Sequence, residues 1–310
     1  MRIVTLTLSA AYDIHAYAEK MEVGLENFID RYETDIGGKG INISRALASY
    51  GVPSTAVIVL GKDNSAEFLS KLEALGLTYE KILIPGKTRE NITVHTNNGE
   101  ETRISFSGTD APQDLIAKVE RITDSILSDG DILTFTGSIP KGAQIEEAKA
   151  FIKRLKTRGV KVIVDSRSFL FSDIIDIKPF LIKPNEYEVQ DYIGISLSEE
   201  SEARLAAEEL RSFGVENVMI TLGKRGAVLA SEEGSFYEPA PSIEALSTIG
   251  AGDSSIAGFI YAISHGCEGR EALRISVAFG TAACLLNGTA PPRKSDVLKI
   301  LGNGSFDIEE

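Results

Sequence analysis

Residues 131–166 read DILTFTGSIPKGAQIEEAKAFIKRLKTRGVKVIVDS. They contain an apolar run typical of a strand, a run with one apolar helical face, and a second strand-like run. The same alternation recurs on both sides, in residues 54–76 and 202–223. Strands that alternate with helices of this length form parallel sheets covered by helices on both faces. The sequence therefore predicts an α/β fold built on a mostly parallel sheet.

The composition is that of a globular protein with an acidic balance. The chain has 310 residues, 43% of them hydrophobic, and a formal net charge of −13. No linker, internal repeat or low-complexity segment interrupts it, so we expect a single domain over residues 1–310. Nucleic acids are bound by basic patches, which argues against a nucleic-acid partner. An acidic enzyme of anionic substrates must gather positive charge at its site.

No stretch of the chain reaches the roughly 18 to 20 apolar residues of a membrane span, so we expect no membrane partner. Arg2 precedes the apolar run IVTLTLSAAY, but threonines interrupt that run and Asp13 soon follows. This alternation predicts a strand rather than a secretion signal, and hence a cytoplasmic protein. Cys267 and Cys284 match no metal-ligand or CxxC spacing, and we predict reduced thiols in the core.

Two segments, approximately residues 9–36 and 88–108, interrupt the alternation with polar, β-prone sequence. The second contains NNG at residues 97–99, which is typical of a hairpin turn. Two such insertions early in an α/β chain indicate either a small additional sheet that acts as a lid or surface hairpins without a role.

The stretch Ile249-Gly250-Ala251-Gly252-Asp253 leads directly into an apolar helical run. Small residues before a helix leave backbone N–H groups free to bind an anion, and the helix dipole favours negative charge there. Asp253 would stand in the first turn. It is either an N-cap or first-turn carboxylate that stabilises the helix, or a base that accepts a proton from a substrate hydroxyl.

A second glycine-rich turn, Gly37-Gly38-Lys39-Gly40, precedes Asn42 and another helical run. Its glycines permit close approach to a ligand, and Lys39 supplies a cation. The spacing is neither that of a Walker A loop nor GxGxxG after a strand. A plain loop-to-helix turn explains this stretch equally well.

Asn185 and Glu188, in the run KPNEYE, lie three residues apart at a predicted helix start. They either form a helix cap or organise a hydrated Mg²⁺ ion. Residues 221–227 join two strand-like runs and either line a nucleotide or form a tight turn. Arg89 and Arg103 lie in the irregular β segments and are further cations for an anionic substrate.

Together these motifs resemble the ribokinase-like (PfkB) family of sugar kinases, which implies a three-layer α/β/α sandwich with a small β-sheet lid. The N-terminal family pattern runs from Gly37 through Asn42 to Gly61, and the C-terminal one from Ser247 to Gly258. The resemblance extends from Thr7 to about Asn287. AAYD, TRENIT and TGSIPKG are similar to the branch that contains 1-phosphofructokinase and tagatose-6-phosphate kinase.

The resemblance implies an enzyme that uses ATP and Mg²⁺ to phosphorylate a sugar phosphate. Asp253 would be the base, and Gly250, Ala251 and Gly252 would form the anion hole. The implied sugar-phosphate site contains Asp13, Gly37, Gly38, Lys39, Asn42, Arg89 and Ser138, of which Lys39 and Arg89, helped by Ser138, would hold the phosphate. The implied ATP site contains Lys183, Asn185, Glu188, Thr221, Gly223, Gly226 and Asn287, with Asn185 and Glu188 organising Mg²⁺ through water.

The TRxN pattern that begins at Thr88 favours fructose 1-phosphate as substrate, to give fructose 1,6-bisphosphate, over tagatose 6-phosphate. The resemblance also implies a homodimer through the lid strands. Two positions depart from the branch: residues 7–11 read TLSAA instead of TLNPA, and Phe28 stands where an Arg often follows the Asn. We expect these changes to affect sugar specificity more than catalysis.

Three other functions are less compatible with the sequence. A non-catalytic sugar-phosphate sensor is expected to lack the base or the glycine turn, and both are present here. A kinase of an unphosphorylated sugar or nucleoside would leave Lys39 and Arg89 without a role. A nucleotide-dependent dehydrogenase would carry GxGxxG after the first strand, which is absent.

Overall fold

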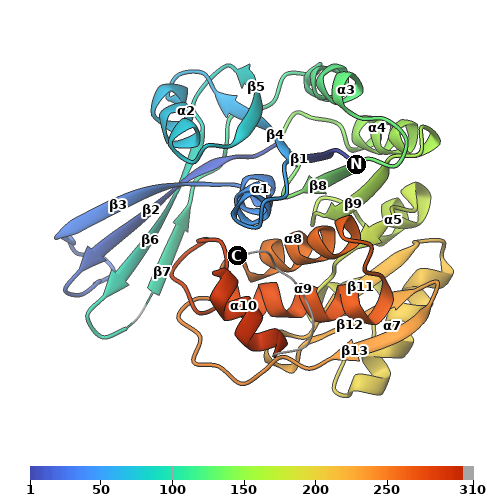
Figure 1. Ribbon diagram of the computed structural model, residues 1–310. Coiled ribbons are helices and arrows are strands. Elements are labelled where there is room, and N and C mark those ends of the chain that lie inside the picture. The colour runs from blue at the N-terminus through green and yellow to red at the C-terminus, as the bar shows by residue number, and fades with distance from the viewer. Residues whose placement is uncertain (100, 303–310) are drawn as a thin grey trace.

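The computed structural model describes residues 1–99 and 101–302, and two sheets organise this part of the chain (Figure 1). The main sheet has the order β13-β12-β11-β10-β9-β8-β1-β4-β5. Its strands are β1 (Ile3–Thr7), β4 (Thr55–Gly61), β5 (Thr78–Ile84), β8 (Ile132–Thr136), β9 (Lys161–Asp165), β10 (Leu181–Ile182), β11 (Asn217–Thr221), β12 (Ala227–Ser231) and β13 (Gly234–Glu238). Pairing is parallel from β5 to β11, and β12 and β13 each join antiparallel to the strand before. The predicted mostly parallel sheet is confirmed.

Helices cover both faces of the main sheet, so its central strands are buried on both sides (Figure 1). One face carries α3 (Leu115–Ile126), α4 (Ile145–Thr157), α5 (Phe171–Ile177), α6 (Glu186–Ile193) and α7 (Glu200–Ser212). The other carries α1 (Lys39–Ser49), α2 (Ser65–Ala74), α8 (Ala251–Ser264), α9 (Gly269–Ala283) and α10 (Lys294–Leu301). The predicted three-layer α/β/α sandwich is therefore confirmed.

The second sheet is small and projects to one side of the helices and the main sheet (Figure 1). Its order is β3-β2-β6-β7, with β2 (Ala11–Ala18), β3 (Arg31–Gly37), β6 (Arg89–Thr96) and β7 (Glu101–Ser105). The strands β2 and β6 pair in parallel, whereas β3 and β7 join antiparallel. The predicted hairpin at residues 97–99 connects β6 to β7, where the Gly99 N–H donates to the carbonyl of Thr96 over 2.9 Å.

The connection from the second sheet to the main sheet places α1 directly against β1. A Cβ atom added to Gly40, in the first turn of α1, would lie 2.7 Å from the carbonyl oxygen of Leu6. Only a glycine permits this approach without a shift of the backbone. The glycine-rich turn and Asn42 are therefore held over the carboxyl end of β1, where open α/β sheets bind ligands.

No helix in residues 1–99 and 101–302 combines the length and apolarity needed to cross a membrane. Both cysteines in this part of the chain are free, as predicted. They are only partly buried, so the prediction of core positions was wrong. Cys267 packs against the edge of the core, and Cys284 lines a cavity described below.

Candidate active site

The helix α8 begins with a backbone turn that only the glycine-rich sequence permits. Gly250 is its N-cap with φ 80° and ψ −5°, a left-handed conformation that favours glycine. The carboxylate of Asp253 makes no capping hydrogen bond; its Oδ2 instead accepts one from Asn42 Nδ2 on α1, over 2.8 Å. Asp253 is therefore not the N-cap, but it is a carboxylate in the first turn of α8, as the other part of that interpretation states.

The environment of Asp253 makes its carboxyl group a weaker acid than usual. The side chain is buried, with 6% of its surface exposed. Burial raises its pKa to about 6, and the nearby Asp165 acts in the same direction. The charge of Lys39 and the hydrogen bond from Asn42 favour the ionised form and limit the rise. A pKa near 6 leaves the carboxylate ionised at neutral pH but able to take up a proton.

Two lysines and a second buried carboxylate stand beside Asp253. Lys39 Nζ donates to Asp165 Oδ2 over 2.7 Å, and Lys183 Nζ lies 3.8 Å from Asp165 Oδ1. Burial alone would raise the pKa of Asp165, but the charges of Lys183 and Lys39 hold it below its ordinary value. A Cβ atom added to Gly252 would lie 3.0 Å from Lys183 Nζ. The ammonium group of Lys183 is therefore in place beside the start of α8.

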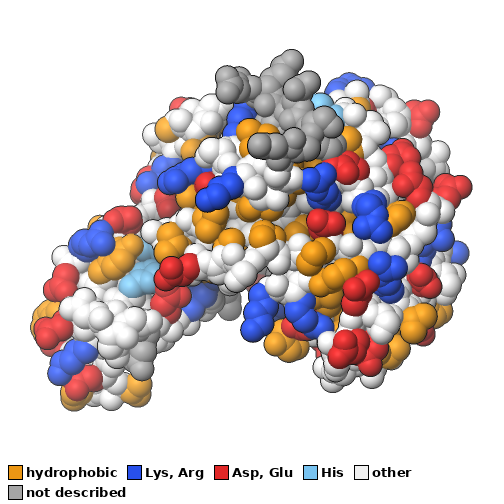
Figure 2. Space-filling view, turned by 60° about the horizontal axis from the view of Figure 1, so that its bottom comes forward, with side chains coloured by type: hydrophobic (Ala, Val, Ile, Leu, Met, Phe, Trp, Pro, Cys, Tyr) orange, Lys and Arg blue, Asp and Glu red, His pale blue; other side chains and the backbone are white. Residues whose placement is uncertain are grey.

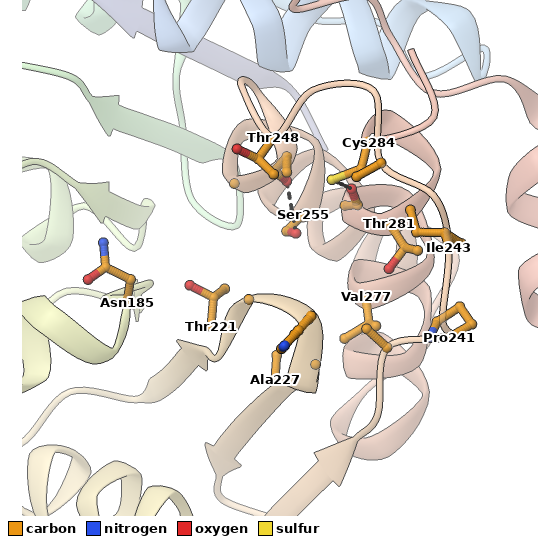
Figure 3. A pocket seen from close by; sticks show the side chains of 18 of the residues that line it. Asn185, Thr221, Ala227, Pro241, Ile243, Thr248, Ser255, Val277, Thr281 and Cys284 are labelled. Atoms are coloured by element: carbon orange, nitrogen blue, oxygen red, sulfur yellow. Dashed lines mark hydrogen bonds between the residues drawn. The ribbon is translucent and has the colours of Figure 1, made fainter. Parts of the chain in front are cut away.

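A cavity of about 640 Å³ opens against this end of α8 (Figure 3). Asn185 and Thr221 point into it from the start of α6 and the end of β11. Val277 and Thr281 of α9 and the loop with Pro241 form the facing side. Ala251 and Gly252 also line it, so the N-terminus of α8 faces this space. Its size and its apolar walls with a few polar groups suit a nucleotide.

Predicted ATP-site residues fall into three groups. Asn185, Thr221, Gly223 and Gly226 line this cavity. Lys183 and Glu188 do not line it, but they line a small adjoining pocket that also contains Asp165 and Pro184. Asn287 is exposed in the loop after α9 and lines neither pocket.

Asn185 and Glu188 form the helix cap that was one of their two interpretations. Asn185 Oδ1 accepts from the N–H groups of Tyr187 and Glu188, and Glu188 Oε2 accepts from the N–H of Asn185 over 2.9 Å. Glu188 Oε1 also accepts from Arg167 Nε. Because these oxygens already have partners, the pair fits a magnesium ion held through water better than one bound directly.

Asp13 and Arg89 lie at the other side of the site, where the second sheet meets the main one. Asp13 Oδ1 accepts from Asn91 Nδ2 over 2.8 Å, and Arg103 lies 3.5 Å from the same oxygen. A Cβ atom at Gly37 would lie 2.0 Å from Asp13 Oδ2, so the glycine allows this carboxylate to occupy its place. Arg89 lines a second cavity, of about 320 Å³.

The similarity of this chain to known proteins identifies its family. The model of the pfkB family of carbohydrate kinases matches residues 3–296. The chain belongs to the pfkB family. A 1-phosphofructokinase of Haemophilus influenzae is 34% identical over 285 residues, which cover 91% of this chain and 90% of the relative. A 1-phosphofructokinase of Escherichia coli K12 is 32% identical over the same shares of the two chains.

Solved structures of pfkB kinases share the fold. Phosphofructokinase-2 of Escherichia coli in complex with potassium has a TM-score of 0.90, 28% identity, and coverage of 97% of this chain and 98% of that one. A ribokinase of Thermotoga maritima shares the fold with a TM-score of 0.78 and 24% identity, over 98% of this chain and 100% of that one. This pfkB chain is thus a carbohydrate kinase with the predicted ribokinase-like fold.

The structure of this pfkB kinase brings together residues that the sequence analysis did not connect. Asp165, at the end of β9, was not predicted; the signal available was its position after a strand at the carboxyl edge of the sheet. The cavity walls from residues 240–248 and from α9 were also missed. Lys39 and Arg89, predicted to meet at one phosphate, are not brought to one pocket: Lys39 pairs with Asp165, and Arg89 lines the smaller cavity. Ser138 is exposed, just after β8.

Proposed function

We propose that this pfkB kinase transfers the γ-phosphoryl group of ATP to fructose 1-phosphate, with fructose 1,6-bisphosphate and ADP as products. The observation that carries the proposal is the buried carboxylate of Asp253 at the N-terminus of α8, beside a cavity of nucleotide size. The similarity to 1-phosphofructokinases over nine-tenths of the chain supports fructose 1-phosphate as the acceptor.

In the proposed reaction, Asp253 acts as the general base. Its carboxylate takes the proton of the sugar's free primary hydroxyl as that oxygen forms a bond to the γ-phosphorus. The bond from the γ-phosphorus to the β,γ-bridging oxygen breaks, and ADP leaves. Asn42 holds the carboxylate in position through its 2.8 Å hydrogen bond. The backbone N–H groups at Ala251 and Gly252 and the ammonium group of Lys183 stabilise the negative charge of the transferred group.

We assign ATP to the cavity of about 640 Å³, with its phosphates toward the start of α8. Magnesium, when bound, supplies positive charge to the β- and γ-phosphates. Among the described residues no group of three or more His, Cys, Asp or Glu side chains could hold a metal ion. This agrees with Mg²⁺ as part of the nucleotide complex, because Mg²⁺ keeps several waters and needs only one or two carboxylates. Glu188 and Asn185 would hold such an ion through water.

We also propose that the second sheet acts as a lid over the sugar phosphate and as a dimer interface. One face carries Asp13 and His15, and a Cβ atom at Gly288, after α9, would lie 3.9 Å from His15 Nε2. The opposite face carries a row of directly paired isoleucines, Ile14, Ile92 and Ile104. Figure 2 shows the sheet as an arm with hydrophobic side chains on its surface. Ile104 is exposed and Ile14 and Ile92 are partly buried, and an apolar row of this kind suits a second copy of the chain.

The test is ADP release from Mg-ATP with fructose 1-phosphate, tagatose 6-phosphate, fructose 6-phosphate, fructose and ribose. We expect turnover with fructose 1-phosphate and none with the free sugars. Turnover of another sugar phosphate would identify that compound as the substrate and keep the protein in the same class of kinases. Turnover on free sugars alone, or ATP binding without turnover on any of the five, would contradict the proposal.

A further inference from the structure

The smaller cavity, of about 320 Å³, gathers positive charge that the proposed mechanism does not use. It lies where β1, β4, β5 and β8 end, and the loop of residues 107–110 closes one side. Its lining contains three cationic side chains, Lys87, Arg89 and Lys141, against the single carboxylate of Asp110. In a chain with a net charge of −13, such a concentration of cations indicates an anion site.

The backbone that carries the two lysines is held in place by one loop. Thr109 Oγ1 donates to the carbonyl of Lys87 over 3.0 Å, and the N–H of Ala111 donates to the carbonyl of Lys141 over 2.7 Å. A Cβ atom at Gly61 would lie 2.2 Å from the carbonyl carbon of Lys87, so the loop after β5 packs tightly on β4. The walls of the cavity are therefore built before a ligand arrives, which lowers the entropy lost on binding.

The positive side chains of this cavity have few hydrogen-bond or ion-pair partners among the described residues. Arg89 Nε is buried and has no hydrogen-bond partner. Burial is the main cause that lowers the pKa of Arg89, although Asp13 acts against it. No carboxylate in residues 1–99 and 101–302 forms an ion pair with Lys87. Within the described part of the chain, the ion pair of Lys141 is with Asp110, over 3.4 Å between largely exposed side chains. Exposed pairs of this kind contribute little, so Lys141 is available to a ligand.

We propose that Lys87 and Lys141 bind, together with Arg89, the phosphate group that the sugar substrate already carries. The two lysines are then specificity-determining residues that select a phosphorylated sugar over a free one. This inference rests on the proposed function. It assigns the phosphate group to the smaller cavity and not to Lys39, whose ammonium group is paired with Asp165. Ser9 and Ala10, two positions that depart from the branch pattern, line the same cavity, so they contact the phosphate end of the substrate.

The test uses the full-length chain and the variants Lys87→Met, Lys141→Met and the double variant, which keep the apolar stems. Lys62→Met is the matched control, because Lys62 is an exposed cation next to this loop that does not line the cavity. We expect each cavity variant to lower kcat/KM for fructose 1-phosphate about 10- to 100-fold through KM. The KM for ATP and the rate with the control should stay within about twofold of the unmodified protein.

A further variant is expected to change the affinity for fructose 1-phosphate in the opposite direction. Asp110→Asn removes the one carboxylate that competes for Lys141, so we expect tighter binding of fructose 1-phosphate, by a few fold. Calorimetric titration of nucleotide-free protein with fructose 1-phosphate, inorganic phosphate and fructose provides a readout independent of turnover. We expect fructose 1-phosphate and inorganic phosphate to bind more weakly to the variants at Lys87 and Lys141 than to the unmodified protein. Fructose should bind the variants and the unmodified protein equally.

The outcomes separate this inference from the proposed function. If the unmodified protein phosphorylates fructose 1-phosphate and the folded double variant does so with an unchanged KM, the lysine assignment is wrong and the proposed function stands. If the unmodified protein phosphorylates none of the sugar phosphates but binds inorganic phosphate only when both lysines are present, the anion site stands and the proposed function is wrong.

Discussion

The carboxylate of Asp253 is buried, and a charged group in this position lowers the stability of the folded protein. Its folded-state pKa of about 6 lies above the ordinary value of 3.8. The folded protein therefore binds a proton more readily than the unfolded chain between about pH 4 and pH 6, and the ionised carboxylate reduces stability as pH rises through this window. A buried carboxylate with a raised pKa beside a cavity is characteristic of an active site.

Replacing Asp253 with Asn should remove the base and keep the shape of the site. We expect kcat to fall about 10²- to 10⁴-fold, the usual contribution of a general base. The melting temperature near pH 7 should not fall, because the substitution also removes a buried charge. Steady-state kinetics and a thermal melt check both statements, with Glu208→Gln on the exposed side of α7 as control. Near-normal turnover of a folded Asn variant would refute the assignment.

The titration of the same group predicts the acidic limb of the pH profile. Below about pH 6 the free enzyme carries a protonated Asp253, which cannot accept the substrate proton. We expect kcat/KM to fall about tenfold per pH unit below this value. The profile of Asp253→Asn, measured at high enzyme concentration, should lack this limb. A wild-type profile that stays level down to pH 4.5 would show that the carboxylate ionises more readily than its burial indicates.

At the scale of elements, the close contact between α8 and α9 holds the helix that carries Asp253 in position. A Cβ atom at Gly258 would lie 2.9 Å from Cβ and Cγ of Phe279 and 3.0 Å from the carbonyl oxygen of Ile275. The fully buried ring of Phe279 has no room to move. The glycine at the end of the C-terminal family pattern is therefore a packing requirement of two helices rather than a ligand contact.

Gly258→Ala tests this packing. We expect a loss of about 1–3 kcal/mol in the free energy of unfolding, because the added methyl group overpacks the contact between the helices. Urea denaturation followed by circular dichroism measures the change. Leu205→Ala on the exposed face of α7 is the control and should cost less than about 0.5 kcal/mol beyond its helix propensity. A Gly258 variant as stable as the parent would show that α8 and α9 separate easily.

At the scale of the whole molecule, the cations needed for anionic ligands lie in two places within an acidic surface. Lys39 and Lys183 stand beside Asp253, and Lys87, Arg89 and Lys141 line the smaller cavity. This distribution agrees with the proposed binding of two phosphorylated substrates by a chain with a net charge of −13. Local charge, rather than net charge, determines the affinity of each site.

The proposed dimer is testable through the apolar face of the second sheet. Tyr32 and Ile104 on this face are 69% and 41% exposed, and they lie on the same face as Ile14 and Ile92. We expect Tyr32→Lys with Ile104→Lys to shift the protein from dimer to monomer in sedimentation velocity. Leu205→Lys, at an exposed position on α7, should leave the oligomeric state unchanged. A monomeric parent protein would contradict the proposal directly.

Features that depend on a few neighbouring residues could be predicted from the sequence. The alternation of apolar periodicities indicated the parallel sheet and its helices, and NNG indicated the hairpin between β6 and β7. The glycine-rich turn before Asp253 predicted the start of α8, where Gly250 takes a left-handed conformation. Each of these follows from backbone freedom or side-chain periodicity within about ten residues, so no distant contact was needed.

Contacts between distant residues depended on the folded structure. Lys39 and Asp165 are 126 positions apart, and a cation in a glycine-rich turn carries no sign of its partner. The same holds for the facing wall of the larger cavity, which α9 and the loop before α8 supply. Local sequence thus predicted the elements and the proposed base. The ion pairs could not be predicted, because they form between groups that are close in space but distant in sequence. The sheet brings these groups together at the ends of its strands.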